Sequence, residues 1–189
     1  MSFNFNDEQR KAILNYARAT IESVFDQSAS PVIDDMGGML KRPGACFVTL
    51  ETVSGHHLRG CIGNIVALEP LGDNIARNAI NAAFHDPRFP QLSACELDEI
   101  TIDISVLNPP EVIASVDDFI VGKHGIIMEC AGCHAVFLPQ VAPEQGWNRE
   151  QTLTHLSMKA GLPADGWGRD DARFQIFTAI VFGEDDFTQ

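Results

Sequence analysis

The residues best suited to chemistry lie in a short segment that begins at His57, where an imidazole, a guanidinium and a thiol alternate with apolar side chains. If this segment is a β-strand, its side chains alternate between two faces, so Arg59 and Cys61 share one face and Leu58 and Ile62 share the other. A guanidinium close to a thiol favours the nucleophilic thiolate. The spacing therefore predicts Arg59 and Cys61 as candidate catalytic residues, with Leu58 and Ile62 in the core.

The same residues also have a purely structural interpretation. Free cysteine is commonly a small buried hydrophobe, and Arg59 could be an ordinary surface charge. Gly60 and Gly63 fit both interpretations, because a residue without a side chain lets either a ligand or another backbone segment approach. His57 adjoins a turn and is expected to be solvated.

A second group of candidates follows a predicted helix, in the segment Asp86-Pro87-Arg88-Phe89-Pro90. The two prolines restrict the backbone and hold Asp86 and Arg88 in a defined orientation. Arg88 could bind an anionic group of a substrate, or the two charges could form an ion pair that fixes the loop. We favour the ion pair, since ordered polar loops often serve structure, and retain both residues as candidate binding residues.

Three more polar residues are candidates for binding a substrate or transferring protons, namely His124, Gln140 and Glu144. His124 lies in a glycine-flanked turn that lacks the upstream glycine and the following Ser or Thr of a phosphate-binding loop. Gln140 and Glu144 lie in a loop predicted from Pro139 to Trp147. Trp147 at the end of this loop could instead pack against the helix that follows.

The segment Cys130-Ala131-Gly132-Cys133-His134 has the spacing of a c-type haem attachment site. It lies in a predicted hairpin connection of a chain without an export signal, and a zinc site would need a second pair of ligands. We therefore predict neither haem nor metal here, and no cofactor for the chain as a whole. The cysteines number five, an odd count, and are expected to be reduced.

Length and composition are typical of one folded domain. The chain has 189 residues, 45% of them hydrophobic, which is enough to bury a full core. The amino-terminal sequence has no secretory signal and no later apolar run is long enough to span a bilayer, so a cytoplasmic location away from membranes is expected. The net charge of −13 argues against general nucleic-acid binding, although a local pocket could still bind one base.

Periodicity and turn signals predict the elements that must position these residues. Helices are expected from Asn6 to about Phe25, from Pro70 to Phe84 and from Asn148 to Gly161. Strands are expected at Cys46–Thr52, His57–Ile62, Ile100–Val106, Ile126–Glu129, Ala135–Leu138 and Phe174–Phe182. The strand from Ile100 should have one solvated face, and the last strand should be central and covered on both faces. Hairpins and helices without a βαβ rhythm predict an α+β fold, with mixed or antiparallel sheets and flanking helices.

The segment Leu58-Arg59-Gly60-Cys61-Ile62-Gly63-Asn64 resembles the signature of the AMMECR domain family. Later blocks resemble further parts of that family in the same order. They are Ala82–Pro90, Ile104–Leu107, Gly122–Gly125 and Leu138–Trp147. The resemblance covers nearly the whole chain, and it implies one AMMECR-type domain over residues 1–189, with two lobes and a cleft near the signature strand.

The resemblance implies two functions and leaves both open, because the family has no established activity. Bacterial and archaeal members look like protein A of the AmmeMemoRadiSam system, which is encoded beside a radical-SAM protein and a dioxygenase-like protein. The chain could be a cysteine-dependent enzyme for a small molecule or nucleobase, with Cys61 as nucleophile or redox thiol and Arg59 tuning it. It could instead be a non-catalytic adaptor or partner subunit for one of those two proteins.

Overall fold

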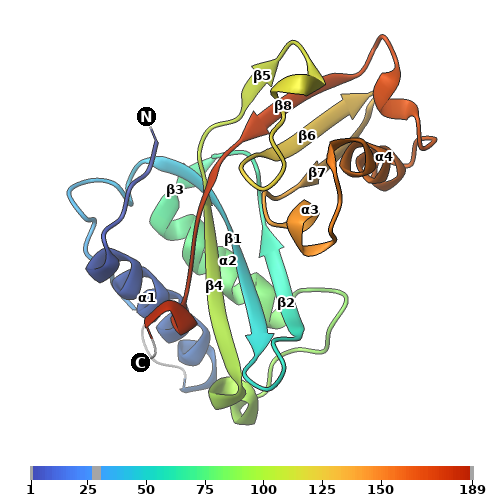
Figure 1. Cartoon of the computed structure of the whole chain (residues 1–189). Helices are drawn as coiled ribbons and strands as arrows, with labels where there is room; N and C mark the ends of the chain where they lie inside the picture. The colour runs from blue at the N-terminus through green and yellow to red at the C-terminus, as the bar shows by residue number, and fades with distance from the viewer. Residues whose placement is uncertain (1, 27–30, 188–189) are drawn as a thin grey trace. The chain divides into compact units, whose positions relative to one another are not determined.

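The computed structural model describes residues 2–26 and 31–187, which form two compact units (Figure 1). The first unit extends to Leu107 and resumes at Ile180, and the second comprises Asn108–Ala179. The second unit is thus an insertion within the first. Among the described residues, no helix is both long and apolar enough to cross a bilayer.

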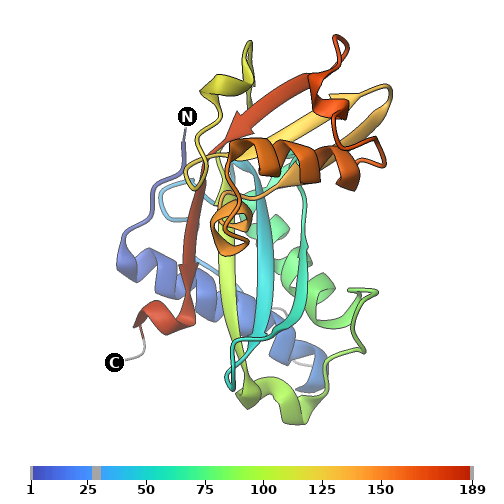
Figure 2. The same ribbon diagram turned by 45° about the vertical axis from the view of Figure 1, so that its right-hand side comes forward.

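The first unit is built on a sheet with strand order β2-β1-β4-β9, in which the short β3 also pairs with β1. These strands are β1 (Pro43–Thr52), β2 (Leu58–Gly63), β3 (Glu69–Pro70), β4 (Ile100–Leu107) and β9 (Ala179–Gly183). Two helices, α1 (Asp7–Asp26) and α2 (Leu71–Phe84), lie on the same face of the sheet (Figure 2). Two short 3-10 helices, η1 (Ala94–Glu99) and η4 (Glu184–Phe187), complete the unit.

The core of this unit lies between the sheet and the two helices. On β1 and β4 it consists of alternating residues, and it includes Cys46, Val48, Leu50, Ile100, Ile102, Ile104 and Val106. The helix α1 contributes Ile13, Ala17 and Ile21 as predicted, whereas Val24 is 47% exposed because it lies in the last turn. The predicted solvated face of β4 is wrong at Thr101 and Ser105, which are both buried. The strand lies inside the sheet between β1 and β9, which the alternation alone does not reveal.

The strand β2 departs from the alternation that the sequence suggests. Its pairing with β1 shifts between Leu50 and Glu51, so that Arg59 is an extra residue in a β-bulge. On the amino-terminal side of the bulge the alternation is reversed, so Leu58 points away from the core and is 41% exposed. The prediction of a buried Leu58 is therefore wrong, while Ile62 packs against the core as predicted.

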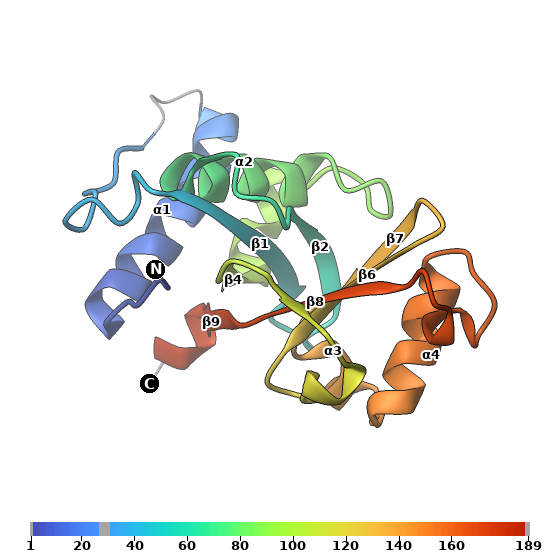
Figure 3. The same cartoon turned by 90° about the horizontal axis from the view of Figure 1, so that it is seen from above.

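The second unit contains a four-stranded sheet with strand order β5-β8-β6-β7, in which all three neighbouring pairs are antiparallel (Figure 3). Its strands are β5 (Glu111–Ile113), β6 (Gly125–Cys130), β7 (Cys133–Phe137) and β8 (Arg173–Phe177). Its helical segments are η2 (Val116–Asp118), α3 (Val141–Glu144), α4 (Arg149–Lys159) and η3 (Gly166–Gly168). Leu153 and Leu156 of α4 are part of a core that includes Ile126, Met128 and Phe174.

Two predictions for this part of the chain need correction. The single strand expected at Phe174–Phe182 is two strands, β8 and β9, which belong to different sheets. The loop expected at Pro139–Trp147 contains the short helix α3. By contrast, the predicted hairpin around Gly132 is present, with Cys130 paired to Cys133.

Candidate functional site

Cys61, Thr49 and Asp103 form one row across three neighbouring strands of the first unit. Thr49 of β1 is the direct partner of Cys61 on β2 and of Asp103 on β4. Directly paired residues of antiparallel strands point to the same face, and their neighbours Val48, Leu50, Ile102 and Ile104 point into the helix-covered core. The thiol, the hydroxyl and the carboxyl therefore share the face opposite the helices.

Within this row, the Thr49 hydroxyl donates a hydrogen bond to the Cys61 sulfur, with Oγ1 and Sγ 3.3 Å apart. Cys61 is half-buried, so its sulfur is enclosed but still partly accessible. The structure thus places a hydrogen-bond donor, Thr49, beside the sulfur of Cys61.

The Cys61 peptide is held from the other side by Asp86 and Arg88. The Cys61 N–H donates to Asp86 Oδ2 at 2.9 Å, and Arg88 Nη2 donates to the Cys61 carbonyl at 3.1 Å. Asp86 and Arg88 are themselves paired, with Nη2 and Oδ2 2.6 Å apart. The ion pair that we favoured from sequence is therefore present, and it occupies the free edge of β2 where a further strand would otherwise pair.

Hydrogen bonding and charge favour the ionised state of this pair, against the opposing effect of burial. The Arg88 guanidinium, aided by two backbone N–H donors, holds the pKa of Asp86 well below its usual range. The pKa of Arg88 is raised, first by its hydrogen bond to Asp86 and further by the neighbouring Cys61. Arg88 is thus the cation that lies at Cys61.

The sequence predicted that Arg59 lies beside Cys61, but its guanidinium is bonded to Glu96. Its Nε donates to Glu96 Oε1 at 2.8 Å and its Nη2 to Oε2 at 3.2 Å. Arg59 is buried, and its Nη1 has no hydrogen-bond partner among the residues that the structure describes. This guanidinium is committed to Glu96, so the observed contacts support a structural role for Arg59.

The Arg59–Glu96 pair gives a prediction for acid stability. The hydrogen bonds from Arg59, and further ones from Ser93, lower the pKa of Glu96 from 4.5 to about 2. The folded state thus holds the carboxylate ionised where the unfolded chain is protonated, so this stabilisation is complete above pH 4.5 and is lost as the pH falls towards 2. We expect Glu96→Gln to lower the free energy of unfolding at pH 7 by about 1–2 kcal/mol and to flatten its decline over this window.

Urea unfolding at a series of pH values measures this effect. Glu129→Gln, at an exposed position in the second unit, is the control and should leave the pH profile unchanged. Parallel pH profiles for wild type and Glu96→Gln would contradict the prediction.

Asp103 has the chemistry of a proton donor and acceptor near neutral pH. Burial, together with the negative charges of Glu51, Asp185, Asp186 and Glu184, raises its pKa from 3.8 to about 6. A general acid or base is most effective when its pKa lies near the working pH. Asp103 is therefore a candidate for proton transfer, the role for which the sequence suggested His124 and Glu144.

The other three candidates, His124, Gln140 and Glu144, belong to the second unit. The Ile120 N–H donates to His124 Nδ1 at 3.2 Å, and burial lowers the pKa of His124. The Glu144 N–H donates to the Gln140 carbonyl in the first turn of α3, and the Gln140 side-chain oxygen is buried without a hydrogen-bond partner among the described residues. Gln140 and Glu144 are thus neighbours, whereas His124 is bonded to its own turn.

The remaining cysteines range from buried to exposed. Burial raises the pKa of Cys46 to about 12 and also raises the pKa of Cys130, so both stay protonated at neutral pH. Cys95 is exposed and Cys133 is half-buried. All five cysteines are free thiols, and among the described residues no group of three or more His, Cys, Asp or Glu side chains is arranged to hold a metal ion.

Sequence reasoning missed Thr49 and Asp103. Both are polar residues in alternating strands, so each had the pattern of a side chain on the non-core face. Only the pairing of β1 with β2 and β4 brings them into register with Cys61. A search for polar residues on the predicted strands next to the signature could have found them.

Comparisons with known proteins identify a family and agree with the fold. A model of the AMMECR1 family matches residues 14–182. Protein MJ0810 of Methanocaldococcus jannaschii is 36% identical over 183 residues, which cover 94% of this chain and 90% of that protein. A protein of Methanothermobacter thermautotrophicus is 38% identical over 185 residues, covering 94% of this chain and 95% of its own.

The crystal structure of uncharacterized protein PH0010 from Pyrococcus horikoshii superimposes with a TM-score of 0.87 at 34% identity, over 96% of this chain and 94% of that one. The predicted α+β fold is thereby confirmed. The resemblance found in the sequence is also confirmed, and the chain belongs to the AMMECR1 family.

Proposed function

We propose that the chain is a cysteine-dependent enzyme that acts on a small molecule, with Cys61 as its nucleophile. The observation that carries this proposal is the row of Cys61, Thr49 and Asp103 across three paired strands. A nucleophile, a hydroxyl that donates to it and an acid with a pKa of about 6 are the minimum set for covalent catalysis.

The row also limits the size of the substrate. Strands β2 and β4 are separated by two strand spacings, so Cys61 and Asp103 are about 10 Å apart with Thr49 between them. A planar ring the size of a nucleobase can lie over Thr49 and reach both groups. The Cys61 thiol loses its proton to solvent and its sulfur adds to an electrophilic sp² carbon of the ring. The π bond of that carbon breaks, its electron pair moves to a conjugated nitrogen or oxygen on the far side of the ring, and protonated Asp103 donates a proton to that atom.

Asp86 and Arg88 support the reaction by fixing the nucleophile. Their two hydrogen bonds hold both backbone groups of Cys61, which keeps its side chain directed at Thr49. Arg88 is 54% exposed in its side chain, so its cation can also attract an anionic group of the substrate. Arg59 enters this scheme as a structural residue.

The setting of the reaction is part of the same proposal. Five free thiols support a reducing compartment such as the cytoplasm. The family resemblance supports a place in an AmmeMemoRadiSam-like system, with a radical-SAM or dioxygenase-like protein as partner. An adaptor role for such a partner is the alternative if Cys61 has no reactivity of its own.

The proposal predicts that Cys61 reacts before the other cysteines. When the full chain is treated at pH 7.5 (about one unit below the usual thiol pKa) with limiting iodoacetamide, peptide mass spectrometry should find Cys61 alkylated first. Thr49→Val keeps the shape of the side chain but removes the donor, and it should slow alkylation of Cys61 about fivefold, since one such hydrogen bond is worth about 1 kcal/mol.

Cys95→Ser is the matched control, because it removes the exposed thiol and should leave Cys61 alkylation unchanged. Cys61→Ser should abolish the fast phase while the protein stays folded. If Cys61 instead reacts no faster than Cys95, the adaptor role replaces the enzyme.

A further inference from the structure

Two asparagines of α2 occupy positions where the packing would favour apolar side chains. Asn74 and Asn78 are fully buried and lie one helical turn apart on the face towards β1. Burying an amide is costly unless its polar atoms are hydrogen-bonded, and Asn78 Oδ1 has no hydrogen-bond partner among the described residues. These asparagines therefore need an explanation beyond the stability of the core.

Asn74 and Asn78 first provide hydrogen bonds to the backbone of β1 at the point where β2 leaves the sheet. The last pair of β2 with β1 is Gly63 with Phe47, and one more backbone bond follows, from the Asn64 N–H to the Cys46 carbonyl at 3.2 Å. The Cys46 N–H donates to Asn74 Oδ1 at 2.9 Å, and Asn78 Nδ2 donates to the Cys46 carbonyl at 3.0 Å. Side chains of α2 thus take the place of the departing strand.

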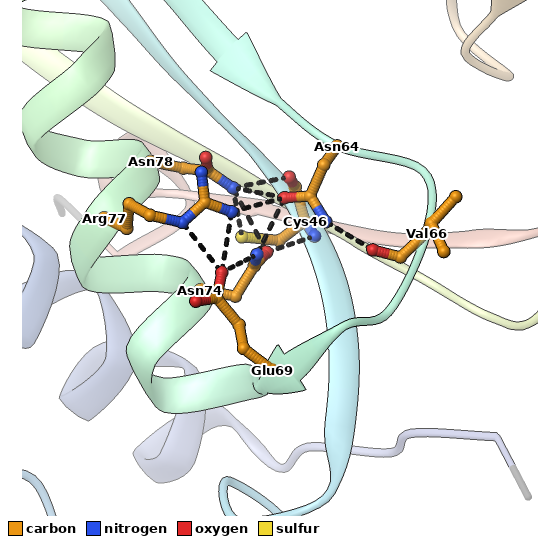
Figure 4. A network of polar contacts seen from close by, with 7 residues as sticks. All are labelled: Cys46, Asn64, Val66, Glu69, Asn74, Arg77 and Asn78. Atoms are coloured by element: carbon orange, nitrogen blue, oxygen red, sulfur yellow. Dashed lines mark hydrogen bonds and ion pairs between the residues drawn. The ribbon is translucent and has the colours of Figure 1, made fainter.

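The same side chains hold Asn64, the last residue of the signature (Figure 4). Its Oδ1 accepts hydrogen bonds from Asn74 at 2.7 Å, Asn78 at 3.0 Å and Arg77 at 3.2 Å. Its Nδ2 donates to the Val66 carbonyl at 2.7 Å. Asn64 is therefore bound to the helix and to its own loop at once.

The carboxylate of Glu69 closes this network at its exposed end. Glu69 Oε1 accepts from Asn74 at 2.6 Å and from Arg77 at 2.8 Å, which lowers the pKa of Glu69. The network therefore links β1, the end of β2, β3 and α2, and side chains supply at least one partner in each of its hydrogen bonds.

The side chains of the strand that ends at Asn64 do little to fix its register, so the strand depends on polar contacts with its neighbours. Asp86 and Arg88 hold the middle of the strand at Cys61, and the α2 side chains hold its end at Asn64. The strand carries two glycines and a bulge, its Leu58 is exposed, and only Ile62 contributes a large side chain to the core. Strands of this composition are prone to slip, and a slip of one residue turns every side chain to the opposite face. Such a slip would move Cys61 away from Thr49.

We propose that Asn64 is a positioning residue, which sets the register of β2 and so places the Cys61 sulfur beside the Thr49 hydroxyl. This inference rests on the proposed role of Cys61 as a nucleophile. The asparagines of α2 then act through Asn64, and their burial serves the placement of the thiol.

A double-mutant cycle between Asn64 and Thr49 tests this placement in the full chain. In the wild type, Thr49→Val should slow iodoacetamide alkylation of Cys61 about fivefold, as estimated above from one hydrogen bond. In the Asn64→Ala background the same change should have less than about a twofold effect, because the sulfur no longer lies at the hydroxyl. Asn64→Asp keeps the acceptor and should retain the larger effect.

An equal effect of Thr49→Val in the wild type and in Asn64→Ala would overturn the inference, since a merely structural anchor leaves the pair intact. If Asn64→Ala does not fold, Asn64→Ser takes its place in the cycle, because a serine side chain lacks the amide that bonds both α2 and the Val66 carbonyl. A full effect of Thr49→Val in that background would overturn the inference. Failure of the proposed function looks different, because Cys61 would then be unreactive, or insensitive to Thr49→Val, in the wild type itself.

Discussion

Gly60→Ala is expected to destabilise the first unit by about 3 kcal/mol, which is severe for the addition of one methyl group. A Cβ on Gly60 would lie 2.1 Å from the carbonyl oxygen of Ala82 and 3.1 Å from its carbonyl carbon. Both atoms belong to the backbone of α2 and cannot move without disturbing the helix. The strand β2 would have to shift away, which would also displace Cys61.

Hydrogen exchange of peptides from β2 and α2 measures this effect. Tryptophan fluorescence does not, because Trp147 and Trp167 both lie in the second unit. Gly72→Ala is the matched control in the same unit, since its Cβ would meet Leu40 at an ordinary 3.6 Å within a helix. It should be neutral or stabilise by roughly 0.5–1 kcal/mol. A Gly60→Ala protein as stable as Gly72→Ala would show that β2 does not pack closely on α2.

Asp103→Asn is expected to have the opposite effect on stability. The pKa of Asp103 is raised from 3.8 to about 6, so the folded state binds a proton more tightly than the unfolded chain does. Wild-type stability should therefore fall as the pH rises from 3.8 to 6 and stay lower above that range. The amide carries no charge, so Asp103→Asn should stabilise the protein on the order of 2 kcal/mol at pH 7 and have little effect below pH 4.

Urea unfolding at these two pH values, followed by circular dichroism, measures the difference. Asp185→Asn is the control, because Asp185 is 56% exposed and contributes only one of the charges that raise the pKa of Asp103, so a smaller gain is expected. Asp103→Asn should also lose any activity that needs a proton from Asp103, so its gain in stability would accompany a loss of function. Equal stabilities of wild type and Asp103→Asn at pH 7 would contradict the prediction.

The features that could be predicted from sequence are those fixed by residues close along the chain. Asn6 begins α1 through reciprocal hydrogen bonds with Gln9, and the capping boxes of Ser93 with Glu96 and of Asn148 with Gln151 are also present. Each depends on residues three positions apart, so the local sequence is sufficient. The Asp86–Arg88 pair followed from the same short range.

The features that were missed depend on pairing between distant segments. Arg59 pairs with Glu96 because it is the extra residue of a β-bulge and so does not follow the alternation of faces along β2. The six-residue sequence of β2 does not reveal this bulge. The run from Phe174 to Phe182 is apolar except at Gln175 and Thr178, which predicts one strand. It divides near Thr178 because each half pairs in a different sheet. Thr49 and Asp103 became site residues only through the register of three strands.

The insertion of the second unit determines the order in which the chain can fold as it leaves the ribosome. Its two ends are fastened to each other, since the Asn108 N–H donates to the Thr178 carbonyl and Asn108 Nδ2 to Thr178 Oγ1, each at 2.8 Å. All of its strands are therefore available before β9, the edge strand of the first sheet, has been synthesised. A nascent chain that has emerged from the ribosome only as far as Ala179 would hold a complete second unit and a first sheet whose β4 edge is still unpaired, and an unpaired edge is open to aggregation.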